Sequence, residues 1–140
     1  MNKNVIMKIL GEQTENGKTN RLELITEGRY YDRDGALCLE YQESEISGME
    51  GVTTTISVQG KMVSLIRRGQ ANSHMVFEPG KKCIHQYDTP MGTMEMGIYP
   101  LRVDVDLGEE EGRVGLSYQL DIDGRFTSSN SISVTYRTVH

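Results

Sequence analysis

Two histidines and a cysteine are the residues whose types and spacing are best suited to chemistry in this chain. His74 precedes, and Cys83 and His85 follow, a predicted tight turn at Pro79-Gly80, since Pro and Gly suit the two central positions of a type II turn. A hairpin through this turn places His74 opposite His85, with Cys83 on the same face. Two imidazoles and a thiolate are competent zinc ligands, and three protein ligands with one water make a catalytic zinc site.

The same cluster also has a purely structural explanation. In this hairpin Met75, Phe77 and Ile84 form an apolar face, so the histidines and the cysteine occupy the polar, half-exposed face. The sequence suggests no fourth ligand. We therefore expect no metal site, and the cluster remains the weaker alternative.

Two arginines at the end of a predicted strand are the next candidates. If the alternation of the strand Met62–Ile66 continues, one of Arg67 and Arg68 points inward. An inward guanidinium could bind the carboxylate or phosphate of a ligand. Charges inside folds are usually paired, however, so a structural ion pair with a glutamate at the barrel end is the favoured alternative.

Methionines are numerous, with eight in 140 residues. Flexible thioethers suit surfaces that adapt to varied apolar partners, and core filling explains them equally well. The residues predicted to bind a ligand are Arg67, Arg68, Met75, Met94, Met96 and Tyr118.

Catalytic and nucleotide-binding motifs are absent from the sequence. It contains no G-x-S-x-G nucleophile elbow, no P-loop and no G-x-G-x-x-G pattern. The sequence therefore predicts no cofactor and does not support an enzyme.

The elements that must position these residues are strands. The segment 114–122 alternates apolar residues with small or polar ones, as expected of a strand with one buried and one wet face. Asp123-Gly124 follows, and a three-residue connection through Arg125 predicts a hairpin. Its expected pairs are Ile122 with Phe126, Leu116 with Ile132, and Val114 with Val134.

A second hairpin is predicted at Gly60-Lys61, where a two-residue loop pairs Val58 with Val63 and Ile56 with Leu65. Further strands are expected at 5–13, 21–31, 36–42, 72–77, 82–87, 92–106 and 131–139. In the long segment 92–106, Gly97 and Pro100 predict a bend or bulge.

Together these strands predict one all-β domain spanning residues 1–140. About eight to ten short antiparallel strands would leave exposed edges unless the sheet closes on itself. A single closed β-barrel is therefore expected, and a β-sandwich is the structural alternative.

Composition excludes several classes of partner. The net charge of −5 disfavours nucleic acid and anionic membrane surfaces, and apolar runs are too short to span a membrane. The N-terminus lacks the apolar segment of a secretory signal. With only Cys38 and Cys83, the chain is expected to be cytoplasmic with reduced thiols, although one bridge between them stays open.

Three segments resemble a known family. They are the run Glu23–Gly28, the segment Tyr41–Gly51 with Thr53-Thr54-Thr55, and Asp88–Thr93. Together they are similar to the YwiB-like family of uncharacterised bacterial proteins, over nearly the whole chain. The resemblance implies a calycin-like, lipocalin-like β-barrel and a source among the Firmicutes. It implies no activity, because the family has no established site residues.

Two functions follow as hypotheses. The first is a non-enzymatic barrel that binds a small, partly apolar molecule in its lumen or mouth, since eight-stranded barrels can hold one small ligand. The second is a protein-interaction module with a filled barrel, such as a homodimer, that uses the segment 43–51 and adjacent strand surfaces such as Tyr30-Tyr31 and Tyr41.

Overall fold

Ten strands and one short turn of 3-10 helix make up the computed structural model, which describes residues 2–70, 72–89 and 91–139. The elements are β1 (Asn2–Glu15), β2 (Lys18–Arg33), β3 (Ala36–Gln42), η1 (Glu45–Ser47), β4 (Val52–Gln59), β5 (Met62–Gly69), β6 (Ser73–Phe77), β7 (Cys83–Thr89), β8 (Gly92–Leu107), β9 (Glu111–Ile122) and β10 (Arg125–Thr138). No helix in these ranges has the length and apolar character that crossing a membrane requires.

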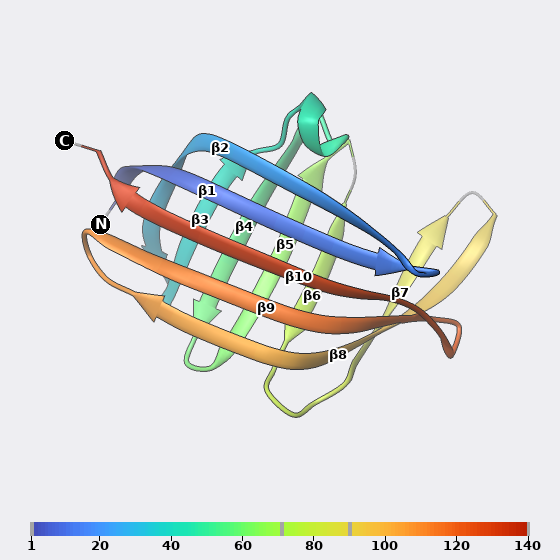
Figure 1. The fold of residues 1–140 in the computed structure, drawn as a ribbon. Coiled ribbons are helices and arrows are strands. Elements are labelled where there is room, and N and C mark those ends of the chain that lie inside the picture. The colour runs from blue at the N-terminus through green and yellow to red at the C-terminus, as the bar shows by residue number, and fades with distance from the viewer. Residues whose placement is uncertain (1, 71, 90, 140) are drawn as a thin grey trace.

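The strands form one antiparallel sheet in the order β6-β5-β4-β3-β2-β1-β10-β9-β8-β7. Figure 1 shows how this sheet curls: β1, β10, β9 and β8 cross steeply in front of β3 to β6. The first strand pairs with the last, and β6 lies against β8 at the other side of the curl. The predicted all-β barrel is confirmed as a nearly closed barrel of ten strands.

Alternation along the strands fills the lumen. Most inward positions on the described strands are apolar, and the largest wholly buried side chain among them is Phe77. Burial of this apolar surface is the main force that stabilises the barrel. The core cluster consists of Val5, Met7, Ile9, Leu24, Tyr30, Leu39, Tyr41, Ile56, Val58, Val63, Leu65, Met75, Phe77, Ile98, Val114, Leu116, Tyr118, Val134 and Tyr136.

The hairpin at Gly60-Lys61 has the predicted register. Val58 pairs with Val63, and Ile56 pairs with Leu65. Gly60 has a φ of 62°, which glycine adopts without steric cost.

The hairpin between β9 and β10 was predicted correctly in its middle and wrongly at its turn. Leu116 pairs with Ile132 and Val114 with Val134, as expected. The connection has two residues instead of three, because Asp123 and Gly124 both have positive φ, which suits a type I′ turn. A bulge between Phe126 and Ser128 absorbs the difference.

The predicted ladder between β6 and β7 is wrong. Within the described residues, the turn between β6 and β7 forms one bridge, from Glu78 to Lys81, and the two strands themselves do not pair. Beyond it β7 pairs with β8, which turns Ile84 outward so that 57% of it is exposed. The long strand β8 has a bulge between Pro100 and Arg102, which agrees with the bend expected at Pro100.

Candidate functional site

The structure brings the two candidate histidines together. The rings of His74 and His85 stack with centroids 6.3 Å apart and planes inclined by 22°. Burial lowers the pKa of His85, and the neighbouring His74 lowers it further. The Nε2 atom of His85 is buried and has no hydrogen-bond partner within the described ranges. In residues 2–70, 72–89 and 91–139, no three His, Cys, Asp or Glu side chains are placed to hold a metal ion.

Arg67 points into the barrel, where a buried glutamate faces it. The Nε atom of Arg67 lies 3.9 Å from Oε2 of Glu43, whose side chain is 2% exposed. Thr54 donates a hydrogen bond of 2.5 Å to the same carboxylate oxygen. Burial and the nearby Glu43 carboxylate raise the pKa of Tyr41. This arginine thus forms the structural ion pair that was the favoured alternative.

The remaining residues predicted to bind a ligand do not converge on one cavity. Arg68 is exposed on the outer face of β5, while Met75 and Tyr118 belong to the core cluster. Met94 and Met96 are half-buried on the inward face of β8 and lie apart from Arg68.

A first cavity, which we call the mouth cavity, lies on the inner face near the β1–β2 turn. Its volume is about 210 Å³. Leu22, Ile132 and Tyr118 supply apolar surface, and the side-chain amides come from inward positions of the same strands. The lining residues are Gly11, Glu12, Gln13, Asn20, Arg21, Leu22, Tyr118, Asn130, Ser131 and Ile132.

A second and larger cavity, which we call the outer trough, lies on the opposite face of the same strands. Its volume is about 480 Å³. Two adjacent cross-strand rows form it, and each row has long side chains at its ends and small residues in its middle. The first row is Glu23, Leu10, Ser133, Gly115 and Asp104, and the second is Arg21, Glu12, Ser131, Ser117 and Arg102.

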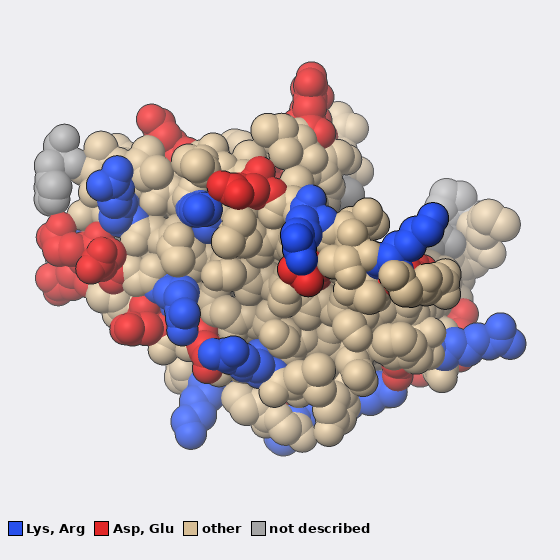
Figure 2. Space-filling view, viewed as in Figure 1, with Lys and Arg blue, Asp and Glu red and all other residues tan. Residues whose placement is uncertain are grey.

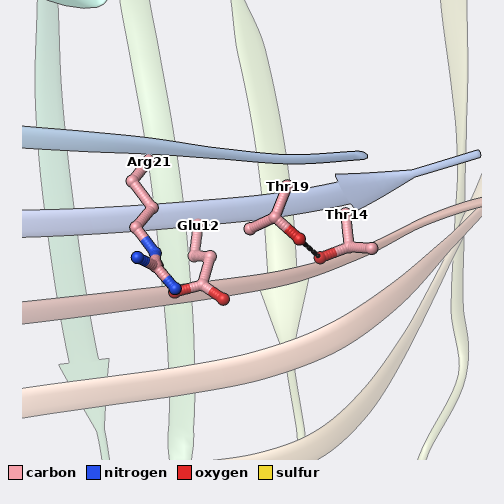
Figure 3. A network of polar contacts seen from close by, with 4 residues as sticks. All are labelled: Glu12, Thr14, Thr19 and Arg21. Carbon is pink, nitrogen blue, oxygen red and sulfur yellow. Dashed lines mark hydrogen bonds and ion pairs between the residues drawn. The ribbon is translucent and has the colours of Figure 1, made fainter. Parts of the chain in front are cut away.

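Ion pairs occupy the walls of the outer trough. On one side Arg21 Nε lies 3.3 Å from Glu12 Oε2, next to a hydrogen bond between Thr14 and Thr19 (Figure 3). On the other side Arg102 pairs with Asp104. These side chains are largely exposed, so each pair contributes at most about 1 kcal/mol to stability.

Sequence reasoning missed the partner of Arg67 and the outer trough. Glu43 follows β3 in a segment that was read only as a loop, and nothing local marks it as buried. The small outward residues of β9, Gly115 and Ser117, were recognised as one wet face. Their alignment with Ser131 and Ser133 follows from the predicted pairing of β9 with β10. The walls of the trough come from β1, β2 and β8, whose pairings were not predicted.

The described part of the chain is thus a β-barrel with a packed lumen, and the mouth cavity and the outer trough lie on its longest strands. Residues 7–134 match the family described as Domain of unknown function (DUF1934), and the chain belongs to this family. A similar protein is the uncharacterized beta-barrel protein YwiB of Bacillus subtilis (strain 168), 25% identical over 122 residues, which are 87% of this chain and 84% of YwiB. The crystal structure of the ywiB protein from Bacillus subtilis superimposes with a TM-score of 0.83 at 22% identity, over 99% of this chain and 94% of that one.

Proposed function

We propose that this protein is a non-enzymatic binder of a small, partly apolar molecule, which it holds in the mouth cavity. The observation that carries the proposal is the combination of apolar walls and amide groups in one hollow. Tyr118 and Leu22 offer apolar contact, while Gln13, Asn20 and Asn130 offer donors and acceptors. A few polar groups set in apolar walls are typical of small-molecule sites.

Because side chains fill the lumen, we place the ligand in the mouth cavity and not in the interior of the barrel. Core side chains occupy the inward positions from β1 to β10, and Phe77 and Tyr118 contact each other edge to face, with ring centroids 4.8 Å apart. A ligand in the lumen would have to displace such contacts, at a cost of several kcal/mol by analogy with large-to-small core substitutions.

The size of the mouth cavity limits the ligand. Its volume of about 210 Å³ lies below the range of about 300–1,000 Å³ of drug-sized ligands. An engineered apolar cavity of roughly 150 Å³ binds benzene. A single ring with one polar group therefore suits the mouth cavity better than a long lipid chain does.

Phenol tests this proposal because it joins an apolar ring to one hydroxyl group. Titration followed by amide NMR is expected to shift the signals of Gly11, Leu22 and Asn130. The variant Gly11→Leu should abolish these shifts, since a side chain at this inward position enters the cavity. A Cβ atom there would lie 3.9 Å from Cβ of Leu22, an ordinary contact.

Thr135→Leu is the matched control, because it places the same side chain on the exposed outer face of β10. It should leave the phenol shifts unchanged. Equal binding of phenol by wild type and Gly11→Leu would contradict the proposal.

A second candidate function is a homodimer that pairs two copies of β7. This strand ends the sheet, and one of its edges lacks a strand partner within the described residues. Unpaired strand edges favour strand addition. Exposed Ile84 on β7 would add apolar contact. Analytical ultracentrifugation tests this candidate: a dimer of the wild type that Ile84→Lys converts to monomer would support it, and a wild-type monomer would contradict it.

The proposal also includes a reducing, cytoplasmic location and a calycin-like relationship. Free thiols at Cys38 and Cys83 support the location, since disulfides are rare in the cytosol. The Bacillus relative supports a source among the Firmicutes.

A further inference from the structure

We propose that the outer trough is a second binding site, which takes a phosphate monoester of a small sugar or polyol. The side chains that form this site project from the outer face of the sheet, whereas those of the mouth cavity project from the inner face, although the two cavities share lining residues such as Glu12 and Ser131. The proposal rests on the shape of the trough, its charges and its unused hydroxyl groups.

The trough is a hollow of ligand size with raised walls. Its volume of about 480 Å³ lies within the range of about 300–1,000 Å³ that is usual for small-molecule sites. Figure 2 shows charged side chains standing around an uncharged area on the face where β1, β10 and β9 lie. The walls are long side chains from β1, β2 and β8, whereas the floor is formed by β10 and β9.

Among the described residues, Arg113 supplies a cation in the trough that no side chain pairs with. Within each of the wall ion pairs, Glu12–Arg21 and Asp104–Arg102, the positive and negative charges compensate each other. Arg113 also lines the trough, and its guanidinium makes no ion pair or hydrogen bond within the described part of the chain. Asp106 is its neighbour in the β8 register, but these two side chains form no ion pair. A guanidinium can bind two oxygens of a phosphate group at once, with strong charge-assisted hydrogen bonds.

Hydroxyl groups and one apolar side chain complete the floor. Ser117, Ser131 and Ser133 are half-buried there, and no described side chain or backbone group bonds their hydroxyls. Each hydroxyl can both donate and accept, as the hydroxyls of a sugar require. Leu10, 41% exposed in the first row, offers apolar contact to the C–H face of a sugar ring. The groups therefore match a molecule with one anionic group and several hydroxyls.

Glucose 6-phosphate is the probe, titrated into the intact protein and followed by amide NMR. Inorganic phosphate and glucose are titrated separately. The expected result is a set of shifts confined to the trough, at Gly115, Ser117, Ser131 and Ser133, with glucose 6-phosphate binding more tightly than either part. Arg113→Gln should weaken the binding by about tenfold or more, because it removes the charge-assisted contact.

Two further variants make the result specific. Ser133→Val replaces the hydroxymethyl side chain on the floor by an isopropyl group, which suits a β-strand, and should reduce the preference for glucose 6-phosphate over phosphate. Arg125→Gln removes an exposed arginine at the start of β10, outside the trough, and should leave the binding of glucose 6-phosphate unchanged. The dispersion of the remaining amide signals shows that each variant is folded.

Three results would overturn the proposal. One is the absence of shifts at the trough in the wild type. Another is phosphate binding as tightly as glucose 6-phosphate, which would mean an adventitious ion only. The third is unchanged binding by folded Arg113→Gln. A phenol titration on the same sample reports separately on the mouth cavity.

Discussion

The barrel has two lines of closure that differ in kind. At the first, β1 and β10 come from opposite ends of the chain and pair through ten residue pairs. At the second, β6 and β7 are neighbours in sequence but do not pair within the described residues, and a single bridge, from Glu78 to Lys81, lies in the segment that connects them. Two strands that are neighbours in sequence therefore need not pair with each other. Backbone hydrogen bonds between two long strands close the first line, whereas contacts between side chains close the second.

Phe77 is the main side chain at the second line. It is wholly buried on β6 and contacts Tyr118 of β9. At the first line, Tyr136 of β10 plays a comparable part: its ring contacts Tyr30, with centroids 5.2 Å apart, and its hydroxyl donates a bond of 2.7 Å to the carbonyl of Gly108.

The largest expected effect comes from Phe77→Ala. It should lower the free energy of unfolding by about 3–5 kcal/mol, as aromatic-to-alanine changes in cores do. Chemical denaturation measures this loss. Hydrogen exchange should show that amides of β6 and β7 lose protection first, because no ladder holds that line when the ring is removed.

Tyr136→Ala is the matching substitution at the first line of closure, where β1 and β10 pair. It should cause a similar loss of stability, with amide protection from hydrogen exchange falling throughout the barrel. If Phe77→Ala also lowered protection evenly throughout the barrel, side-chain packing would not be what holds β6 and β7 together, and the two lines of closure would not differ.

An intermediate loss of stability is expected for a substitution at Thr54, in β4, which pairs with a strand on each side. The variant Thr54→Val keeps the shape and removes the hydrogen bond to the buried Glu43 carboxylate. Hydrogen bonds to charged groups are worth about 1.5–3 kcal/mol, so unfolding should become easier by that amount. Thr53→Val, which loses a bond on the exposed side of the same strand, is the control and should cost less. Equal losses would mean that Thr54 contributes nothing through Glu43.

A smaller, pH-dependent effect is expected at His85 on the second line of closure. Its pKa is lowered in the folded protein, so the unfolded chain binds more protons at this residue. Its contribution to stability is therefore present above the unfolded pKa of about 6.5 and is lost as the pH falls through the lower folded value. His85→Gln should show a weaker loss of stability between about pH 7 and pH 5 than the wild type. Parallel pH profiles for the two proteins would contradict this prediction.

The smallest effect is expected from Lys82→Met, just beyond the single bridge. Lys82 Nζ lies 2.7 Å from Asp121 Oδ2 and reaches this carboxylate across Gly97 of β8. Because Lys82 is 42% exposed, the ion pair should contribute at most about 1 kcal/mol. Thermal unfolding at low and high salt measures it, and a loss larger than that of Thr54→Val would show that this contact, too, closes the barrel.

Sequence patterns predicted the fold where local rules were sufficient. Alternation in the segment 114–122 identified the inward face of β9, and Gly60 identified a tight turn with its correct register. The prediction for β6 and β7 was wrong because a Pro-Gly turn specifies a reversal, whereas the pairing after it depends on competition from β8. The prediction of Arg67 as an inward charge needed only alternation, but its partner Glu43 comes from a loop 24 positions earlier and could not be read locally.

The sequence by itself determined the class of fold, the faces of most strands and the positions of the tight turns, because these depend on period-two alternation and on residues that tolerate positive φ. Only the tertiary structure decided which line of closure is laddered, which charges are buried together and where the hollows lie. The mouth cavity and the outer trough depend on side chains from neighbouring strands standing in the same rows. That alignment depends on register across five strands, of which only the pairing of β9 with β10 was predicted, and a bulge in β8 shifts the wall residues Arg102 and Asp104 by one position.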